Sequence, residues 1–190
     1  GQIQNKEQFL KMPIGLVDFT EQCMQKPLVF DWQSQNPHLL LVGSSSDLNA
    51  GLRSILFALF STHSPADVHF YMLEFGQGLR DTLLSSYPHV GDILSEEETE
   101  KIARALDLFE DEFRKREEDS LSGKKQSKRP DLFLVINNLA GLRNNENWYM
   151  RVFQLLSNDC HQYGIHIIAM ALPQGTGTKV PTNDIKRFKS

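Results

Sequence analysis

The segment from Gly43 to Ala50 has the spacing of a phosphate-binding loop but lacks most of its chemistry. Such a loop follows the pattern G-x-x-x-x-G-K-[ST]: its backbone N–H groups cradle the phosphates, its lysine reaches the outer phosphates, and its hydroxyl contacts Mg²⁺. Gly43 fills the first position. Leu48, Asn49 and Ala50 then replace the second glycine, the lysine and the hydroxyl. We therefore expect a degenerate nucleotide site here.

Each replacement removes a separate function. Leu48 adds a side chain where the backbone must approach phosphate, Asn49 is too short and uncharged to reach the β and γ phosphates, and Ala50 offers no hydroxyl to magnesium. The carboxylate of Asp47 would repel a polyphosphate. The motif alone favours a plainer explanation, in which Ser46 or Asp47 simply caps the N-terminus of a helix. The degenerate nucleotide-binding candidates are Gly43, Ser44, Ser45, Ser46, Asp47, Leu48, Asn49 and Ala50.

Polar residues follow two other apolar runs. Asn137 and Asn138 stand where a Walker B carboxylate would hold Mg²⁺, and an asparagine keeps the shape of that group without its charge. The alternative is that both asparagines cap a turn. Glu74 closes another strand, at the edge where α/β proteins bind ligands, and is a weaker candidate for a ligand contact. None of these residues is a confident catalytic group.

The sequence predicts no metal site. Its six histidines share no metal-ligand spacing, such as i and i+4 on one helix. Cys23 and Cys160 lie far apart, so we expect reduced, buried thiols in a cytosolic protein. Residues 175–179 (GTGTK) mimic a phosphate loop, but no helix clearly follows them, so we predict a flexible loop. We expect no cofactor, with ATP and Mg²⁺ as ligands only if the altered loop still binds them.

Four apolar runs predict the strands that position these segments. Runs without alternation are typical of parallel strands covered on both faces. The predicted strands are residues 39–42, 68–75, 132–136 and 165–171. Shorter signals predict a turn-and-edge segment near residues 9–18 and a short strand at 28–32.

Helical periodicity fills the intervals between these strands. One helix is predicted from Asp47 through Leu59, a long one from Ser95 with Glu98 completing a capping box, and a third over residues 147–162. Residues 117–130 are polar and predict a mobile linker loop. Strands that alternate with helices indicate an α/β fold, with a mostly parallel sheet and helices on both faces.

Length and charge narrow the classes of function. The 190 residues predict a single domain spanning residues 1–190. The net charge of −4 argues against a general nucleic-acid binder, and the basic patches at 124–129 and 186–189 are interpreted as a solvated loop and a frayed end. No apolar run approaches the ~20 residues of a membrane helix. Both ends look cut, so we expect a piece of a larger protein, truncated at its C-terminus.

Five segments together resemble the FtsK/SpoIIIE family of ATPases. More narrowly, they resemble a late, third ATPase domain of the type VII secretion motors EssC and EccC. The order and spacing of the segments carry the resemblance, which covers residues 12–172. The segments are 38–45 (HLLLVGSS), 63–76 (HSPADVHFYMLEFG), 88–92 (PHVGD), 133–138 (FLVINN) and 163–168 (YGIHII).

The resemblance implies a RecA-like P-loop fold. It also implies a membrane-anchored, multi-domain protein whose ATPase domains lie on the cytoplasmic face of the membrane and, in active members, hydrolyse ATP as hexamers. This sequence departs from active members at the positions that bind and activate nucleotide, which are Leu48, Asn49, Ala50 and Asn137. We therefore expect little or no ATP hydrolysis. Late domains of these motors are often degenerate, and some bind the C-terminal export signal of small helical substrates; that surface carries over by fold only.

Three functions remain open. We favour a degenerate ATPase domain of a type VII secretion motor that acts through docking to neighbouring ATPase domains, through regulation and through binding of export substrates. One alternative is an active ATPase with a non-standard phosphate loop, in which Arg53 or a neighbouring subunit supplies the missing charge. The other is a DNA translocase, against which the net charge and the lack of a basic wing argue.

Overall fold

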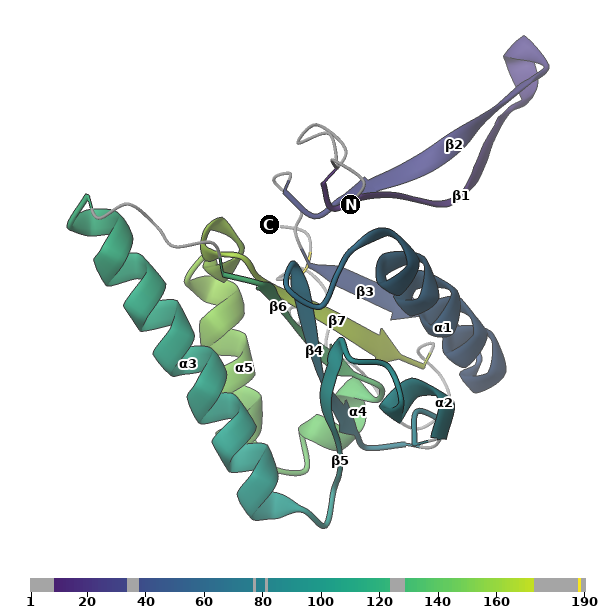
Figure 1. Cartoon of the computed structure of the whole chain (residues 1–190). Helices are drawn as coiled ribbons and strands as arrows, with labels where there is room; N and C mark the ends of the chain where they lie inside the picture. The colour runs from purple at the N-terminus through teal and green to yellow at the C-terminus, as the bar shows by residue number, and fades with distance from the viewer. Residues whose placement is uncertain are drawn as a thin grey trace.

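The chain forms a parallel sheet with helices on both faces, together with a separate hairpin (Figure 1). A computed structural model describes residues 9–33, 38–76, 78–80, 82–123, 129–172 and 188. The main sheet has five parallel strands in the order β3-β7-β6-β4-β5, and β1 pairs with β2 in an antiparallel ribbon. This arrangement confirms the predicted fold class.

The elements have the following bounds. The strands are β1 (Lys11–Phe19), β2 (Met24–Asp31), β3 (Leu39–Val42), β4 (Val68–Glu74), β5 (Val90–Ser95), β6 (Asp131–Ile136) and β7 (Ile165–Ala171). The helices are α1 (Ser45–Thr62), α2 (Thr82–Ser85), α3 (Thr99–Leu121), α4 (Leu139–Leu142) and α5 (Glu146–Ser157). Short 3₁₀ turns, η2 (Thr20–Gln22) and η3 (Cys160–Tyr163), follow β1 and α5. Within the described part of the chain, no helix combines the length and apolar character needed to cross a bilayer.

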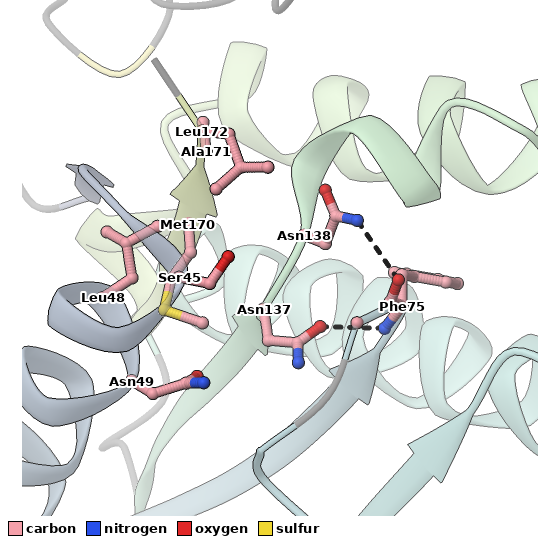
Figure 2. A pocket seen from close by; sticks show the side chains of 10 residues that line it. Ser45, Leu48, Asn49, Phe75, Asn137, Asn138, Met170, Ala171 and Leu172 are labelled. Atoms are coloured by element: carbon pink, nitrogen blue, oxygen red, sulfur yellow. Dashed lines mark hydrogen bonds between the residues drawn. The ribbon is translucent and has the colours of Figure 1, made fainter. Parts of the chain in front are cut away.

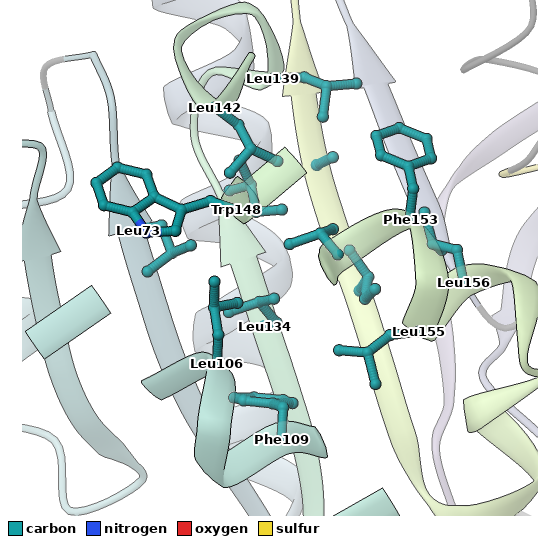
Figure 3. Close-up of a cluster of buried hydrophobic side chains, with 14 of the residues drawn as sticks. Leu73, Leu106, Phe109, Leu134, Leu139, Leu142, Trp148, Phe153, Leu155 and Leu156 are labelled. Carbon is teal, nitrogen blue, oxygen red and sulfur yellow. The ribbon is translucent and has the colours of Figure 1, made fainter. Parts of the chain in front are cut away.

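The sheet separates two apolar clusters. Alternate side chains of β4 point to opposite faces, so that Phe70 and Met72 pack beneath α1 while Leu73 packs toward α3 and α5. Figure 3 shows the second cluster, in which Leu106 of α3 and Leu155 of α5 approach the sheet. All seven residues of β7 are buried, as predicted for a strand covered on both faces.

The start of the long helix differs from the prediction. α3 begins at Thr99, and Ser95 instead ends the edge strand β5, which the sequence analysis missed. The Glu98 carboxylate accepts hydrogen bonds from the backbone N–H of Ser95 at 3.0 Å and from its hydroxyl at 3.2 Å, so only half of the expected capping box forms. Gly91 in β5 lies so close to the Tyr71 ring that a Cβ there would be 2.8 Å from the ring. This glycine weakens the strand signal but is required by the close approach.

Three further boundaries were also wrong. α3 continues to Leu121, so the first part of the predicted loop at 117–130 is helical; residues 124–128 lie outside the described residues. The predicted helix at 147–162 is divided into α5 and η3, because the chain leaves the helical conformation at Asp159, whose φ is +50°. The strand predicted at 28–32 begins earlier than expected, because β2 starts at Met24. Most of the turn-and-edge segment at 9–18 is the strand β1, which pairs with β2.

A buried arginine closes the amino end of the sheet. Arg116 of α3 is 7% exposed and donates to the carbonyls of Tyr163 at 2.9 Å and Pro130 at 2.9 Å. Its Nε donates to Glu112 at 3.1 Å. These bonds connect α3 to the segments that lead into β6 and β7, and they satisfy carbonyls that have no strand partner.

We expect Arg116→Met to lower the free energy of unfolding by about 2–4 kcal/mol, because it leaves buried carbonyls without a donor. Urea denaturation of the 190-residue chain measures this change. The matched control is Arg114→Met on the same helix, where the side chain is 66% exposed and pairs with Asp111. The control should change stability by less than about 0.5 kcal/mol. Equal losses in the two variants would contradict the role given to Arg116.

A second polar group at this end of the sheet is a buried histidine. His38 Nδ1 accepts the backbone N–H of Ile167 at 3.1 Å, and its Nε2 lies 3.9 Å from the buried Cys160 sulfur. Burial, followed by the nearby His166 and His161 rings, lowers the pKa of His38 from 6.5 to about 3. Burial also raises the pKa of the Cys160 thiol, as predicted for a buried cysteine. The His38 and Cys160 side chains are therefore held in their neutral forms at pH 7. Cys23 is exposed, so the prediction of a buried thiol was wrong there.

This lowered pKa predicts a pH dependence of stability. Between pH 3 and pH 6.5 the unfolded chain binds a proton at His38 that the folded chain does not, so stability is complete above pH 6.5 and falls as the pH drops. The slope from this one group is at most about 1.4 kcal/mol per pH unit. Denaturant unfolding between pH 7 and pH 5 should show a shallower slope in His38→Asn, which keeps an acceptor for Ile167. An unchanged slope would contradict this assignment.

Candidate functional site

The carboxyl ends of four parallel strands surround a cavity of about 510 Å³ (Figure 2). β7 lies between β3 and β6, so the end of β3 and the end of β6 face one another across the end of β7. The sheet therefore brings the start of α1 and the two asparagines to one site. The described lining residues are Ser45, Leu48, Asn49, Phe75, Gly76, Asn137, Asn138, Met170, Ala171 and Leu172.

The connection between β3 and α1 has only two residues, Gly43 and Ser44. α1 begins at Ser45, earlier than predicted, and its N-cap is Ser44 rather than Ser46 or Asp47. The Ser44 hydroxyl donates to the Asp47 carboxylate at 2.6 Å, and its carbonyl accepts the N–H of Leu48 at 2.9 Å. From Leu48 onward, the backbone N–H groups are used inside the helix rather than turned toward the cavity.

The three residues that replace the motif have structural contacts of their own. Leu48 is 6% exposed and belongs to the same apolar cluster as Met170, beside which it lies in Figure 2. Asn49 lies against Gly78, where a Cβ would be 2.5 Å from its amide nitrogen. Ala50 is exposed, and its carbonyl accepts the hydroxyl of Ser54 at 2.9 Å. None of the three positions is left as an open loop.

Both asparagines bind the backbone around Phe75. The side-chain oxygen of Asn137 accepts the N–H of Phe75 at 2.9 Å, and the amide nitrogen of Asn138 donates to the Phe75 carbonyl at 3.2 Å (Figure 2). The Asn138 oxygen also accepts the N–H of Ala140 at 3.2 Å and caps α4. The turn-capping explanation therefore holds for Asn138. Asn137 instead joins the end of β6 to the residue after β4.

Glu74 shapes the loop that follows β4. Its carboxylate is buried and accepts the N–H groups of Leu79 at 2.8 Å and Arg80 at 3.3 Å. From the other side, the Arg53 guanidinium donates to the Gly78 carbonyl. Glu74 does not line the cavity, and Arg53 is engaged with the loop. Of the segment Gly76–Gly78, residue 77 lies outside the described residues.

The site offers neutral polar groups within apolar walls. Hydroxyl and amide groups come from Ser45, Asn49, Asn137 and Asn138, whereas no described lining residue carries a charge. The described residues also contain no group of three or more His, Cys, Asp or Glu side chains that could hold a metal ion. Such a surface can bind neutral acceptors and donors, but its described lining residues include no titratable acid or base.

Sequence reasoning missed the floor of this cavity. Met170, Ala171 and Leu172 come from the end of β7, and Phe75 comes from the end of β4. The apolar run at 165–171 indicated where this strand ends. The run could not indicate that the strand end lies in the site, because the position of β7 between β3 and β6 is set by strand pairing.

The sequence is similar to a known protein family and to proteins of type VII secretion systems. The profile of the FtsK/SpoIIIE family matches residues 2–180. The ESX-3 secretion system protein EccC3 of Mycobacterium tuberculosis is 31% identical over 175 residues, which are 83% of this chain and 13% of EccC3. The type VII secretion system protein EssC of Staphylococcus aureus is 31% identical over 109 residues, which are 56% of this chain and 7% of EssC. The chain thus spans only a small part of these relatives.

Solved structures of EssC and EccC from other organisms share the fold. EssC (ATPases 2 and 3) from Geobacillus thermodenitrificans superposes with a TM-score of 0.78 at 18% identity, over 95% of this chain and 36% of that one. Thermomonospora curvata EccC (ATPases 2 and 3), in complex with a signal sequence peptide, gives a TM-score of 0.69 at 25% identity, over 87% of this chain and 33% of that one. The chain belongs to the FtsK/SpoIIIE family, and within it the chain is similar to the ATPase domains of the type VII secretion proteins EccC and EssC.

Proposed function

We propose that this chain is a non-hydrolysing ATPase-type domain of a type VII secretion motor, which acts through contacts with neighbouring ATPase domains and with export substrates. The observation that carries the proposal is the early start of α1 at Ser45. A phosphate loop binds through backbone N–H groups that are not used by a helix. Here the N–H of Leu48 is bonded to Ser44 within the first turn of the helix.

The residues around the cavity do not fit a nucleoside triphosphate with Mg²⁺. Three or four negative charges would need a lysine or arginine beside the phosphates, and the described lining has neither. The metal favours a carboxylate ligand, but the described lining supplies the Ser45 hydroxyl and amide groups instead. The Asn137 amide oxygen already accepts the Phe75 N–H. The Asp47 carboxylate, near the start of α1, adds repulsion. We derive no reaction step through this site.

The active-ATPase alternative depends on a charge supplied from elsewhere. Arg53 was the candidate within the chain, but its guanidinium donates to the Gly78 carbonyl on the loop after β4. Bringing Arg53 to the cavity would require this contact to break. The DNA-translocase alternative has no support beyond membership of the family, and the chain's net charge of −4 opposes it.

Contacts with other domains and with substrates are supported by the relatives. One structural neighbour at 25% identity, Thermomonospora curvata EccC, was solved with a signal sequence peptide, so we propose that this chain also contributes to binding an export signal. Two further neighbours are cytoplasmic domains of EssC and EccC, and we place the chain on the cytoplasmic side of the membrane. The full protein would provide the membrane anchor, the other ATPase domains and any hexameric assembly.

Titration with Mg-ATP tests the loss of nucleotide binding. At about 5 mM Mg-ATP we expect no binding heat and a shift in Tm below about 1 °C. A nucleotide that did bind, at 100 times its Kd, would add about 2.7 kcal/mol to the free energy of unfolding and raise the Tm by several degrees. Isothermal calorimetry and a thermal-shift scan of the 190-residue chain measure both quantities. Clear magnesium-dependent binding by the unmodified chain would contradict the proposal.

A restored variant tests the assignment of the lost functions. We expect the combination of Leu48→Gly, Asn49→Lys, Ala50→Thr and Asn137→Asp to bind Mg-ATP more tightly than the unmodified chain, because it returns the loop, the cation, the hydroxyl and the carboxylate. The control Ser61→Lys adds the same positive charge to an exposed position at the far end of α1. If the unmodified chain hydrolyses ATP as fast as the restored one, the proposal fails.

A further inference from the structure

The β1-β2 hairpin has a buried base and a projecting arm. At the base, Leu10 and Trp32 are 0% exposed and Met12 is 5% exposed, and all three belong to the apolar cluster beneath α1. The backbone also joins there, with the N–H of Trp32 donating to the Leu10 carbonyl at 3.0 Å. Beyond this base the ribbon extends away from the body of the domain (Figure 1). We call residues 15–29 the arm.

The arm exposes large apolar side chains on both of its faces. Every residue from 18 to 29 is exposed. Leu28 and Val29 follow one another in β2 and so point to opposite faces. The exposed fractions of the large apolar side chains are Leu16 68%, Val29 51%, Leu28 45%, Met24 42% and Phe19 40%.

A ribbon of this kind is unfavourable in isolation. Two strands alone are marginally stable in water, and both strands of the arm also present unpaired backbone groups along their outer edges. Single exposed apolar residues are normal on a protein surface, but a contiguous set on both faces marks an interaction site. The firmly anchored base keeps the arm away from the core of its own domain, so the covering surface must come from elsewhere.

Charge indicates the chemistry of the partner. Residues 9–33 contain three carboxylates and two lysines and no arginine. One of the lysines, Lys11, pairs with Asp31 at the base at 3.4 Å, and the other, Lys26, lies over the Phe19 ring at 5.5 Å from its centroid. A nearly neutral, apolar arm does not suit a nucleic acid or an anionic membrane, both of which are recognised by clustered positive charge. It suits an apolar protein surface.

We propose that the arm docks on a neighbouring ATPase domain of the same polypeptide. This inference rests on the proposed function for the presence of that domain. The chain spans 13% of EccC3, and the solved neighbours carry ATPases 2 and 3 in one chain, of which this chain covers about a third. A tethered domain is present at an effective concentration in the millimolar range, so it outcompetes a second copy of the protein for the arm. The arm is thus an inter-domain contact built into the N-terminal part of the domain.

Photo-crosslinking in the full-length protein tests the contact. Leu16, the most exposed large apolar side chain of the arm, is replaced by p-benzoyl-L-phenylalanine, and the products are identified by mass spectrometry. The control carries the same residue at Leu121, which is 82% exposed at the end of α3. We expect intrachain products with another ATPase domain at a yield about tenfold above the control, because the tethered partner is held close. Mixing chains of two isotopic compositions separates intrachain from interchain products.

Three outcomes would overturn the proposal: products at the level of the Leu121 control, products between two copies, or products with a different protein. A double variant, Leu16→Ser with Val29→Ser, gives a second readout. It should leave the Tm of the 190-residue chain nearly unchanged, since both side chains are exposed, but should speed proteolysis between domains of the full-length protein severalfold. Unchanged proteolysis would also count against the contact. The Mg-ATP titration of the 190-residue chain is independent of both tests, so failure of this inference is distinguishable from failure of the proposed function.

Discussion

Burial of the central strands on both faces is the constraint on which the rest of the structure depends. β7 exposes none of its seven side chains, and β6 buries all but the first of its six. Helices must therefore cover both faces at once, with α1 on one side and α3 and α5 on the other. Because the apolar strands provide most of the stabilisation, the loops at the carboxyl edge can change their chemistry while the fold persists.

The start of α1 shows how the core and the site are coupled. Leu48 faces the apolar cluster beneath α1, and its burial holds the first turn of the helix in place. Within that turn the Leu48 N–H bonds to the Ser44 carbonyl, whereas a phosphate loop would leave such a group open. Leu48 thus contributes to stability and also favours the early start of α1, on which the proposed loss of nucleotide binding rests. Asn137 is also a residue of the site with a structural contact, since its amide oxygen joins the end of β6 to the Phe75 backbone.

The domain has two regions that differ in how much apolar surface they expose to solvent. The α/β body binds buried polar groups within itself, as the Arg116 bonds to the Tyr163 and Pro130 carbonyls illustrate, and its large apolar side chains form two buried clusters. The hairpin arm leaves apolar side chains and strand edges uncovered. The body thus has a buried apolar core, whereas the arm has an exposed apolar surface. This division suits the proposed docking, because inter-domain contacts must form without disturbing the folding of each unit.

The sequence by itself determined the fold class, four of the five strands of the main sheet, and the absence of a lysine at position 49, a hydroxyl at position 50 and a carboxylate at position 137. These features depend on residue type and local periodicity, which a linear pattern records. The tertiary structure alone decided that β5 is a strand, because the approach of Tyr71 requires Gly91 there. It also decided that Met170 lies in the site, that α1 starts at Ser45 and that the hairpin arm projects. Strand order, helix starts and exposure are set by contacts between residues distant in sequence, and no local pattern contains them.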